Sequence, residues 1–226
     1  MGQHSEVPDD AALFGLNHTG RADAWPLGSY NRLMSTAVPA PFTEAEYLAL
    51  ERASETKHEF VRGVITSMAG ARPPHNILAA RMTIALGRAI GARGCEVMTS
   101  DQRVHVPAKR MYAYPDVAVA CGERRYDFED PPSLLNPVLL VEITSKTTKD
   151  YDRGSKFLEY QSIDSFREYW VVSHEEVRVD HHQRLETGQW LTTTYLGLEA
   201  EVHLASFEGV VLLADIYGGV NLEEGG

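Results

Sequence analysis

The sequence has few of the features that mark membrane, secreted or zinc-scaffolded proteins. No apolar run approaches the roughly 18 residues that a membrane-spanning helix needs. The N-terminus shows no basic segment followed by an apolar one, which argues against a secretory signal. The chain carries 2 cysteines among 226 residues, too few for a disulfide framework or a four-ligand zinc site built on cysteine. These absences predict no membrane partner and a reducing, cytoplasmic setting.

Low-complexity composition is also missing. Glycine and proline number 18 and 11, and 43% of the residues are hydrophobic, as in ordinary globular proteins. The net charge of −11 at first argues against a nucleic acid partner, because like charges repel. The charge is uneven, however: residues 71–110 carry seven basic and two acidic side chains, and residues 157–226 carry three and thirteen. A solvated surface of mixed charge explains the same pattern, so charge alone does not identify the partner.

Ordered patterning begins shortly after residue 40. Residues 1–40 contain scattered proline, glycine and polar residues without periodicity, which predicts an irregular or disordered extension. Thr43 and Glu46 have the spacing of a capping box, which predicts a helix that runs to about Lys57. We therefore predict a single domain over residues 41–220, followed by a tail at 221–226.

Hydrophobic periodicity in that domain predicts an α/β fold. The expected elements are a strand–turn–strand unit at 59–65, a helix from 75 to about 91, strands at 95–100, 102–107, 114–121 and 138–144, a helix at 152–162 and a strand at 168–172. The strand at 138–144 is apolar on both faces, as a central strand covered on both sides would be. Alternating residues beyond 177 predict an antiparallel C-terminal extension. The expected architecture is a mixed central sheet flanked by helices.

A carboxylate inside the most apolar strand is out of place physically. An isolated charge at Glu142 would be costly to desolvate, so it should be paired, protonated or bound to a cation. Asp116 lies on a neighbouring candidate strand, where Ala118 and Ala120 leave space on the same face. Two carboxylates on adjacent strands suit a hard cation such as magnesium or manganese. Each also has an ordinary explanation: Asp116 as a turn cap, and Glu142 as the partner of a buried arginine.

A lysine on the following helix adds a positive charge. Asp152, Lys156 and Tyr160 are spaced by four and share one helix face. This helix follows the Glu142 strand directly, so the face can pack back over the end of that strand. Lys156 could then neutralise a phosphate or orient a water molecule. A surface ion pair with Asp152 is the simpler alternative.

The remaining candidate motifs are weak. The 9 histidines form no H-x-x-x-H pair, and the adjacent His181 and His182 would point to opposite faces of a strand. His75 stands at the start of a helix, where it could meet a phosphate, although a helix cap is the simpler role. No glycine-rich phosphate loop and no G-x-S-x-G motif occur.

Three phrases, in this order, resemble the PD-(D/E)XK nuclease superfamily and, within it, the Uma-two group of putative restriction endonucleases. They are Tyr114-Pro115-Asp116, the strand end 141–145 and residues 151–160. Other segments similar to that group are 58–63, 68–70, 75–76, 100–104 and 167–171. The resemblance covers about residues 42–220, and the order and spacing of its phrases make it more specific than any one of them.

The resemblance implies a restriction-endonuclease-like core of the αβββαβ type and metal-dependent cleavage of DNA phosphodiester bonds. It implies that Asp116 and Glu142 hold Mg²⁺ or Mn²⁺ and that Lys156 assists catalysis. It also implies that Glu59 supplies a further acidic ligand or positions the attacking water. The predicted activity is that of a magnesium-dependent endodeoxyribonuclease.

One position departs from the superfamily. Its lysine usually follows the acidic strand residue by two positions, and Thr144 stands there in this chain. The lysine is therefore assigned to the following helix at Lys156, with Lys146 and Lys149 as rivals. The departure and the acidic C-terminal third favour an alternative function, a catalytically silent nuclease fold that acts as a binding or accessory module. A homodimer stays open, because cutting both strands of a duplex requires two active sites.

Overall fold

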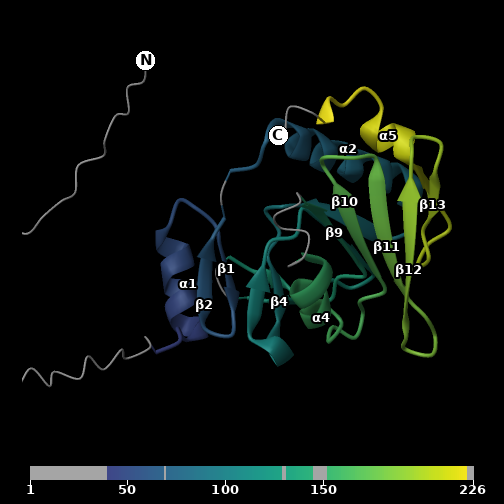
Figure 1. The fold of residues 1–226 in the computed structure, drawn as a ribbon. Coiled ribbons are helices and arrows are strands. Elements are labelled where there is room, and N and C mark those ends of the chain that lie inside the picture. The colour runs from purple at the N-terminus through teal and green to yellow at the C-terminus, as the bar shows by residue number, and fades with distance from the viewer. Residues whose placement is uncertain (1–39, 69, 129–130, 145–151, 223–226) are drawn as a thin grey trace, which may run out of the picture. The chain divides into compact units, whose positions relative to one another are not determined.

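The computed structural model describes residues 40–222, apart from 69, 129–130 and 145–151. The described residues form two six-stranded sheets and one two-stranded ribbon, with helices packed against them (Figure 1). The predicted domain boundaries near residues 40 and 220 stay predictions.

The first sheet begins at the capping box predicted from the sequence. Thr43 caps α1 (Glu44–Ala53), and the reciprocal contacts with Glu46 are both present. The turn between β1 (His58–Val61) and β2 (Val64–Ser67) consists of Arg62 and Gly63, both with positive φ, as in the turns that favour glycine. The sheet order is β2-β1-β5-β4-β8-β7. The other strands are β4 (Val104–Val106), β5 (Met111–Ala113), β7 (Tyr126–Asp127) and β8 (Ser133–Leu134).

The second sheet is the mixed central sheet that the sequence predicts. Its order is β12-β11-β10-β9-β6-β3. The strands are β3 (Cys95–Thr99), β6 (Val117–Cys121), β9 (Leu139–Thr144), β10 (Glu168–Ser173), β11 (Arg178–Arg184) and β12 (Trp190–Leu196). The β9 and β10 strands are parallel, and the other neighbours in the sheet are antiparallel. All six residues of β9 are buried, as expected for a central strand.

Helices cover both faces of this sheet (Figure 1). On one face, α2 (Pro73–Ile90) buries Leu78, Met82 and Leu86 against Val141 and other strand residues. The ribbon of β13 (Glu201–His203) and β14 (Val210–Leu212) and the helix α5 (Leu213–Tyr217) join that layer. On the other face, Phe157 and Tyr160 of α4 (Phe157–Tyr160) pack against Leu140 and Tyr169.

Several predicted bounds were wrong. The helix expected at 152–162 is a π-helical turn, η2 (Asp152–Lys156), followed by the single turn of α4. Pro73 and Pro74 start α2, where a missing N–H costs nothing. The strand expected at 102–107 is shortened to β4, because Pro107 opens the 3-10 turn η1 (Pro107–Lys109). The helix α5 was not expected.

The two cysteines face each other across β3 and β6 and form a disulfide. They are 26 residues apart in the chain, and only the strand register brings them together. The expectation of a reducing environment gave no reason to predict this bond. None of the helices in the described ranges is both long and apolar enough to cross a bilayer. The cytoplasmic location stays a prediction.

Candidate active site

The two carboxylates singled out in the sequence lie opposite each other: Glu142 is on β9, and Asp116 directly precedes β6, the neighbouring strand. Val117 of β6 pairs with Val141 of β9 in an antiparallel register. Extending that register by one residue places Asp116 opposite Glu142. Side chains alternate along a strand, so both carboxylates lie on the sheet face that carries Ala118 and Leu140. This is the face covered by α4.

Glu142 is paired with a cation, as its position in an apolar strand requires. The side chain is 7% exposed, and its Oε1 lies 2.9 Å from Nζ of Lys156. The hydroxyl of Tyr160 also donates to Oε1, at 3.3 Å. The two partners are four residues apart and approach from η2 and α4, as predicted from their spacing. The cation that contacts Glu142 here is Lys156, where the alternative expected an arginine.

Lys156 joins the two sheets through a second carboxylate. Its ammonium donates to Oε1 of Glu59, on β1, at 2.7 Å, and the residue is only 4% exposed. Oε1 of Glu59 also accepts the backbone N–H of Tyr114 at 3.4 Å. A buried ammonium is tolerated only where carboxylates compensate its charge. Here Glu59 and Glu142 share one ammonium. The alternative of a surface ion pair for Lys156 was therefore wrong.

Asp116 is held from two sides. Its Oδ2 accepts the backbone N–H of Ile143 at 2.7 Å. Its Oδ1 lies 3.2 Å from Nε2 of His75, in the first turn of α2. His75 therefore contacts Asp116, a contact that its position at a helix start did not suggest. A carboxylate has about four lone-pair sites, so these two contacts leave capacity for a cation.

The structure adds one residue that the sequence analysis missed. His174 follows β10, is buried, and its ring meets that of His75 edge-on with the centroids 6.2 Å apart. Neither ring nitrogen has a hydrogen-bond partner within the described part of the chain. Burial lowers the pKa of His174, and His75 and Arg72 lower it further, against the raising effect of Glu175 and Asp116. The parallel pairing of β9 and β10 brings His174 to this edge, and no local motif indicates it.

The donor atoms limit what the site can hold. Within the described ranges, no three His, Cys, Asp or Glu side chains lie close enough together to enclose a metal ion. Magnesium, however, is commonly held by one or two carboxylates together with water and phosphate oxygens. The pair of Asp116 and Glu142 fits that smaller requirement. The rival lysines, Lys146 and Lys149, lie outside the described residues.

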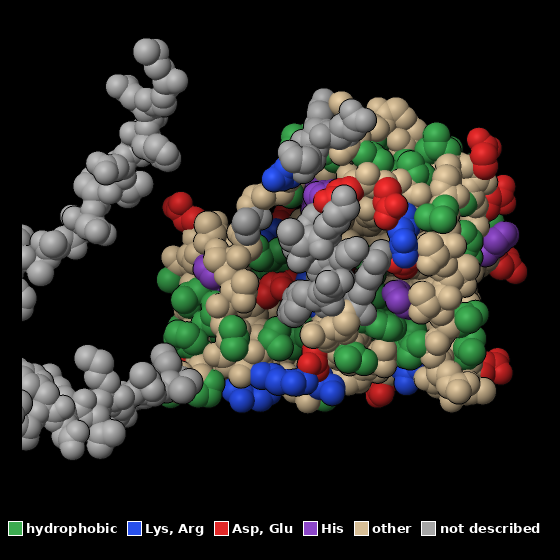
Figure 2. All heavy atoms as spheres, in the orientation of Figure 1, with side chains coloured by type: hydrophobic (Ala, Val, Ile, Leu, Met, Phe, Trp, Pro, Cys, Tyr) green, Lys and Arg blue, Asp and Glu red, His purple; other side chains and the backbone are tan. Residues whose placement is uncertain are grey.

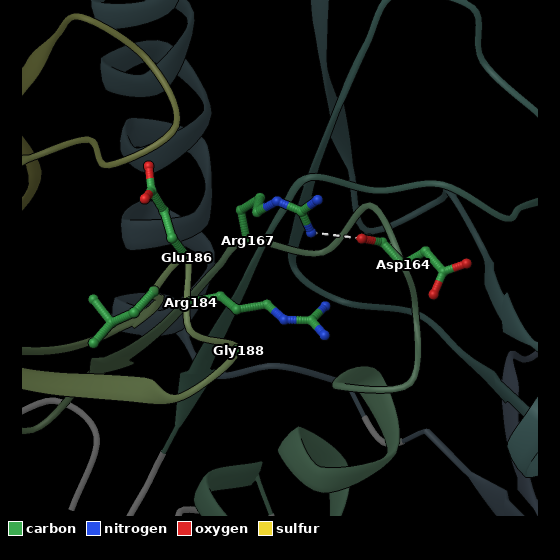
Figure 3. Close-up of a pocket in the computed structure, with 6 residues that line it drawn as sticks. Asp164, Arg167, Arg184, Glu186 and Gly188 are labelled. Carbon is green, nitrogen blue, oxygen red and sulfur yellow. Dashed lines mark hydrogen bonds between the residues drawn. The ribbon is translucent and has the colours of Figure 1, made fainter.

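A large pocket lies at the other end of the central strands. Its volume is about 510 Å³, and Figure 3 shows Asp164, Arg167, Arg184 and Glu186 around it. Arg167 donates to the backbone carbonyl of Asp164. Arg167 directly precedes β10, and Arg184 ends β11. Glu142 lies in the second half of β9, which runs parallel to β10, so it is nearer the opposite end of these strands. None of the four predicted site residues lines this pocket.

The surface gives no simple electrostatic guide to the site. Figure 2 shows acidic and basic side chains interspersed over the face that it presents. Arg62 and Lys109 both pair with Glu159, and Arg110 pairs with Glu44. This pattern agrees with a solvated surface of mixed charge. The candidate site is thus defined by its buried contacts.

The chain is similar to proteins of one family. Residues 44–215 match the model of the family described as Uma2, putative restriction endonuclease. Two uncharacterized proteins of Synechocystis sp. are similar. The protein sll1609 is 33% identical over 173 residues, which cover 76% of this chain and 98% of that protein. The protein slr1290 is 31% identical over 162 residues, which cover 71% and 84%.

A solved structure shares the fold. It is described as a putative nuclease belonging to DUF820 from Anabaena variabilis. The TM-score is 0.60 at 14% sequence identity, and the match covers 74% of this chain and 93% of that one. This likeness confirms the restriction-endonuclease-like α/β fold predicted from the sequence.

Proposed function

Because the chain belongs to the Uma2 family of putative restriction endonucleases, we propose that it is a metal-dependent endonuclease that hydrolyses DNA phosphodiester bonds. One observation carries the proposal. The buried ammonium of Lys156 lies between Glu59 and Glu142, and Asp116 stands opposite Glu142 on the next strand. Carboxylates that can hold a divalent cation and a positive charge that can face a phosphate thus meet in one place.

Asp116 and Glu142 would hold the metal ion, Mg²⁺ or Mn²⁺. Their oxygens are the hard donors that these cations prefer, and two carboxylates are enough when water and phosphate complete the shell. A bound ion would polarise the phosphoryl oxygens and make a bound water easier to deprotonate. The backbone N–H of Ile143 and the His75 ring keep the Asp116 carboxylate in place.

Lys156 and Glu59 supply the remaining functions. The Lys156 ammonium can stabilise negative charge that develops on the phosphate, because a buried charge acts strongly where water is excluded. Glu59 fixes the position of that ammonium through its 2.7 Å contact. Tyr160 holds Glu142 from the same side through its hydroxyl. Glu59 could also position a water molecule, as the resemblance implies.

A catalytically silent binding or accessory module is the second candidate. Two observations favour it. Thr144 occupies the strand position where the superfamily usually has its lysine. The Lys156 ammonium already contacts both Glu59 and Glu142, so it competes with a cation for Glu142. Calorimetric titration with Mg²⁺ and Mn²⁺ separates the two candidates, because the endonuclease needs a divalent ion and the silent module does not.

The direct test is cleavage of supercoiled plasmid with Mg²⁺ or Mn²⁺. Asp116→Asn should abolish nicking and linearisation. Asp101→Asn is the matched control, because Asp101 is exposed and pairs with Lys57 at the surface. Metal-dependent cutting that survives in Asp116→Asn would place the active site elsewhere. Absence of cutting on plasmid, single-stranded DNA and RNA, without metal binding, would favour the silent module.

A further inference from the structure

The outer edge of β12 carries no partner strand in the described part of the molecule. β12 ends the order of the second sheet and is seven residues long. Residues 191–194 within it are exposed. Leu191 and Leu196 are 49% and 63% exposed, which is unusual for leucine on a strand. An edge of this length exposes backbone N–H and C=O groups that another strand can pair with.

The strand lacks the features by which proteins usually protect such edges. β12 contains no charged residue and no proline. The opposite edge of the same sheet differs. β3 is five residues long and carries Glu96, which lies 3.7 Å from Arg124. In a chain with net charge −11, an uncharged edge strand is unusual. It suggests that another strand pairs with this edge.

The sequence of β12 is nearly symmetric about its central residue. It reads Trp-Leu-Thr-Thr-Thr-Tyr-Leu, with Thr193 in the middle. A second copy that runs antiparallel about Thr193 would place Thr192 against Thr194. It would also place Leu191 against Tyr195, and the terminal Trp190 against Leu196. Aromatic–aliphatic and Thr–Thr pairs across strands are favourable, so the strand is complementary to itself.

The backbone register agrees with this symmetry. The N–H of Leu185 donates to the carbonyl of Gln189, and the N–H of Gly197 donates to the carbonyl of Val177. These two contacts continue the β11–β12 register by one residue at each end. In both, the residue on the β12 side has an odd number. Hydrogen-bonded pairs alternate in an antiparallel ladder, so the even-numbered residues of β12 direct their backbone groups away from β11. A two-fold axis at Thr193 places residue 190 of one copy against 196 of the other, and 192 against 194. The free backbone groups of one copy therefore face those of the other.

We propose that β12 is a dimer interface, at which two copies of this chain join their second sheets into one continuous sheet across a two-fold axis at Thr193. The proposal stands independently of the proposed nuclease activity, although it would supply the two active sites that duplex cleavage requires. Pairing through one strand buries less than the ~1,600 Å² of a standard interface, so the dimer should be weak and reversible.

Symmetric cross-linking tests the axis directly. Thr193 would face its own copy in a non-hydrogen-bonded pair, where Cα atoms are ~4.5 Å apart, within reach of a disulfide. Thr193→Cys should therefore form a covalent dimer under mild oxidation. Thr187→Cys, on the exposed β11–β12 turn, is the control and should not. Residue 191 of one copy would face residue 195 of the other. A mixture of the Leu191→Cys and Tyr195→Cys proteins should therefore cross-link, whereas each protein alone should not, and this result would define the register.

Sedimentation equilibrium of the full chain gives the second measurement. The unmodified protein should show a reversible monomer–dimer equilibrium. Thr193→Lys places like charges on the axis and should raise the Kd at least tenfold, with circular dichroism and melting temperature unchanged. Thr187→Lys should not. A monomer at all concentrations without Thr193→Cys cross-linking would overturn the proposal, and so would a dimer that Thr193→Lys leaves intact.

Discussion

Two buried carboxylates lie on neighbouring parallel strands, Glu142 on β9 and Glu168 on β10, and they serve as a comparison within one sheet. Glu168 is fully buried and Glu142 is 5% exposed. Glu168 alternates with Tyr169 and so shares the α2 face with Trp170, whereas Glu142 lies on the α4 face. Each sits in an apolar strand, so sequence hydrophobicity does not distinguish them.

The environment of Glu168 is closed. Its oxygens accept from the backbone N–H of Ser206 at 2.6 Å and from the indole N–H of Trp170 at 3.4 Å. Nε2 of His181 lies 2.9 Å away. Burial raises the pKa of Glu168, but His181 and the backbone N–H groups of Ser206 and Ala205 outweigh it, so the pKa lies below its ordinary value. This carboxylate holds the fold together.

Glu142 shares its cationic partner with another carboxylate. Its cation, Lys156, also serves Glu59, and Asp116 stands opposite on the next strand. Two carboxylates therefore share one lysine, and a third stands opposite Glu142. Such concentration of like charge costs stability and recurs at functional sites. The comparison teaches that burial of a carboxylate does not indicate function, whereas the balance of charge around it does.

The largest expected effect separates the two residues by activity. If Glu142 holds the metal ion, Glu142→Gln should lower the rate of plasmid cleavage by at least ~10³-fold, because an amide is a poor ligand for Mg²⁺. Glu168→Gln, the same change on the next strand, should keep the rate within about threefold when assayed below its melting temperature. Initial rates of nicking measure both. Equal losses in the two variants would contradict the assignment.

The loss of folding stability should have the opposite order in the two variants. Glu168→Gln leaves buried donors poorly matched and should lower the free energy of unfolding by ~2–3 kcal/mol. Glu142→Gln should change it by less than ~1 kcal/mol, because Lys156 keeps Glu59 and one of the crowded carboxylates loses its charge. Urea denaturation at neutral pH without divalent ions measures both. A larger loss in Glu142→Gln would make Glu142 a structural residue like Glu168.

A smaller effect is expected at His75, which acts through Asp116. Removing a group that orients a metal ligand typically costs at least tenfold in metal affinity, so His75→Ala should weaken Mn²⁺ binding by ~10-fold. His75→Gln should recover part of the loss, because an amide can still donate to Asp116. Isothermal calorimetry measures both. His203→Ala, on β13, is the control, and an unchanged affinity in His75→Ala would remove His75 from the site.

Local signals explain what the sequence predicted well. The capping box at Thr43, the turn at Gly63 and the doubly apolar strand at 138–144 depend on near neighbours in the chain. The prediction that Asp116 lies near Glu142 depended only on two adjacent strands. The prediction that Lys156 lies near them depended on the helix that follows the Glu142 strand. Glu59 entered only through the family resemblance, because nothing local connects β1 with β9.

Contacts that depend on long-range register were not predictable. His174 contacts His75 because β10 runs parallel to β9 and ends at the edge of the sheet where α2 begins. The partner of Glu168, His181, is set by the β10–β11 register. The π-helical turn that brings Lys156 inward has no signature in the spacing, which predicted an ordinary helix.

The smallest expected effect concerns acid stability and again distinguishes Glu168. A carboxyl with a depressed folded-state pKa contributes stability that is present above its unfolded pKa, here 4.5, and is lost as the pH falls through the folded value. The stability difference between the unmodified protein and Glu168→Gln should therefore be constant from pH 7 to about 5. It should shrink on further acidification, because only the unmodified protein loses the ionised carboxylate. Urea denaturation at a series of pH values measures this difference, and a gap that stays constant below pH 4 would mean that the ionised form of Glu168 is not the one that the fold stabilises.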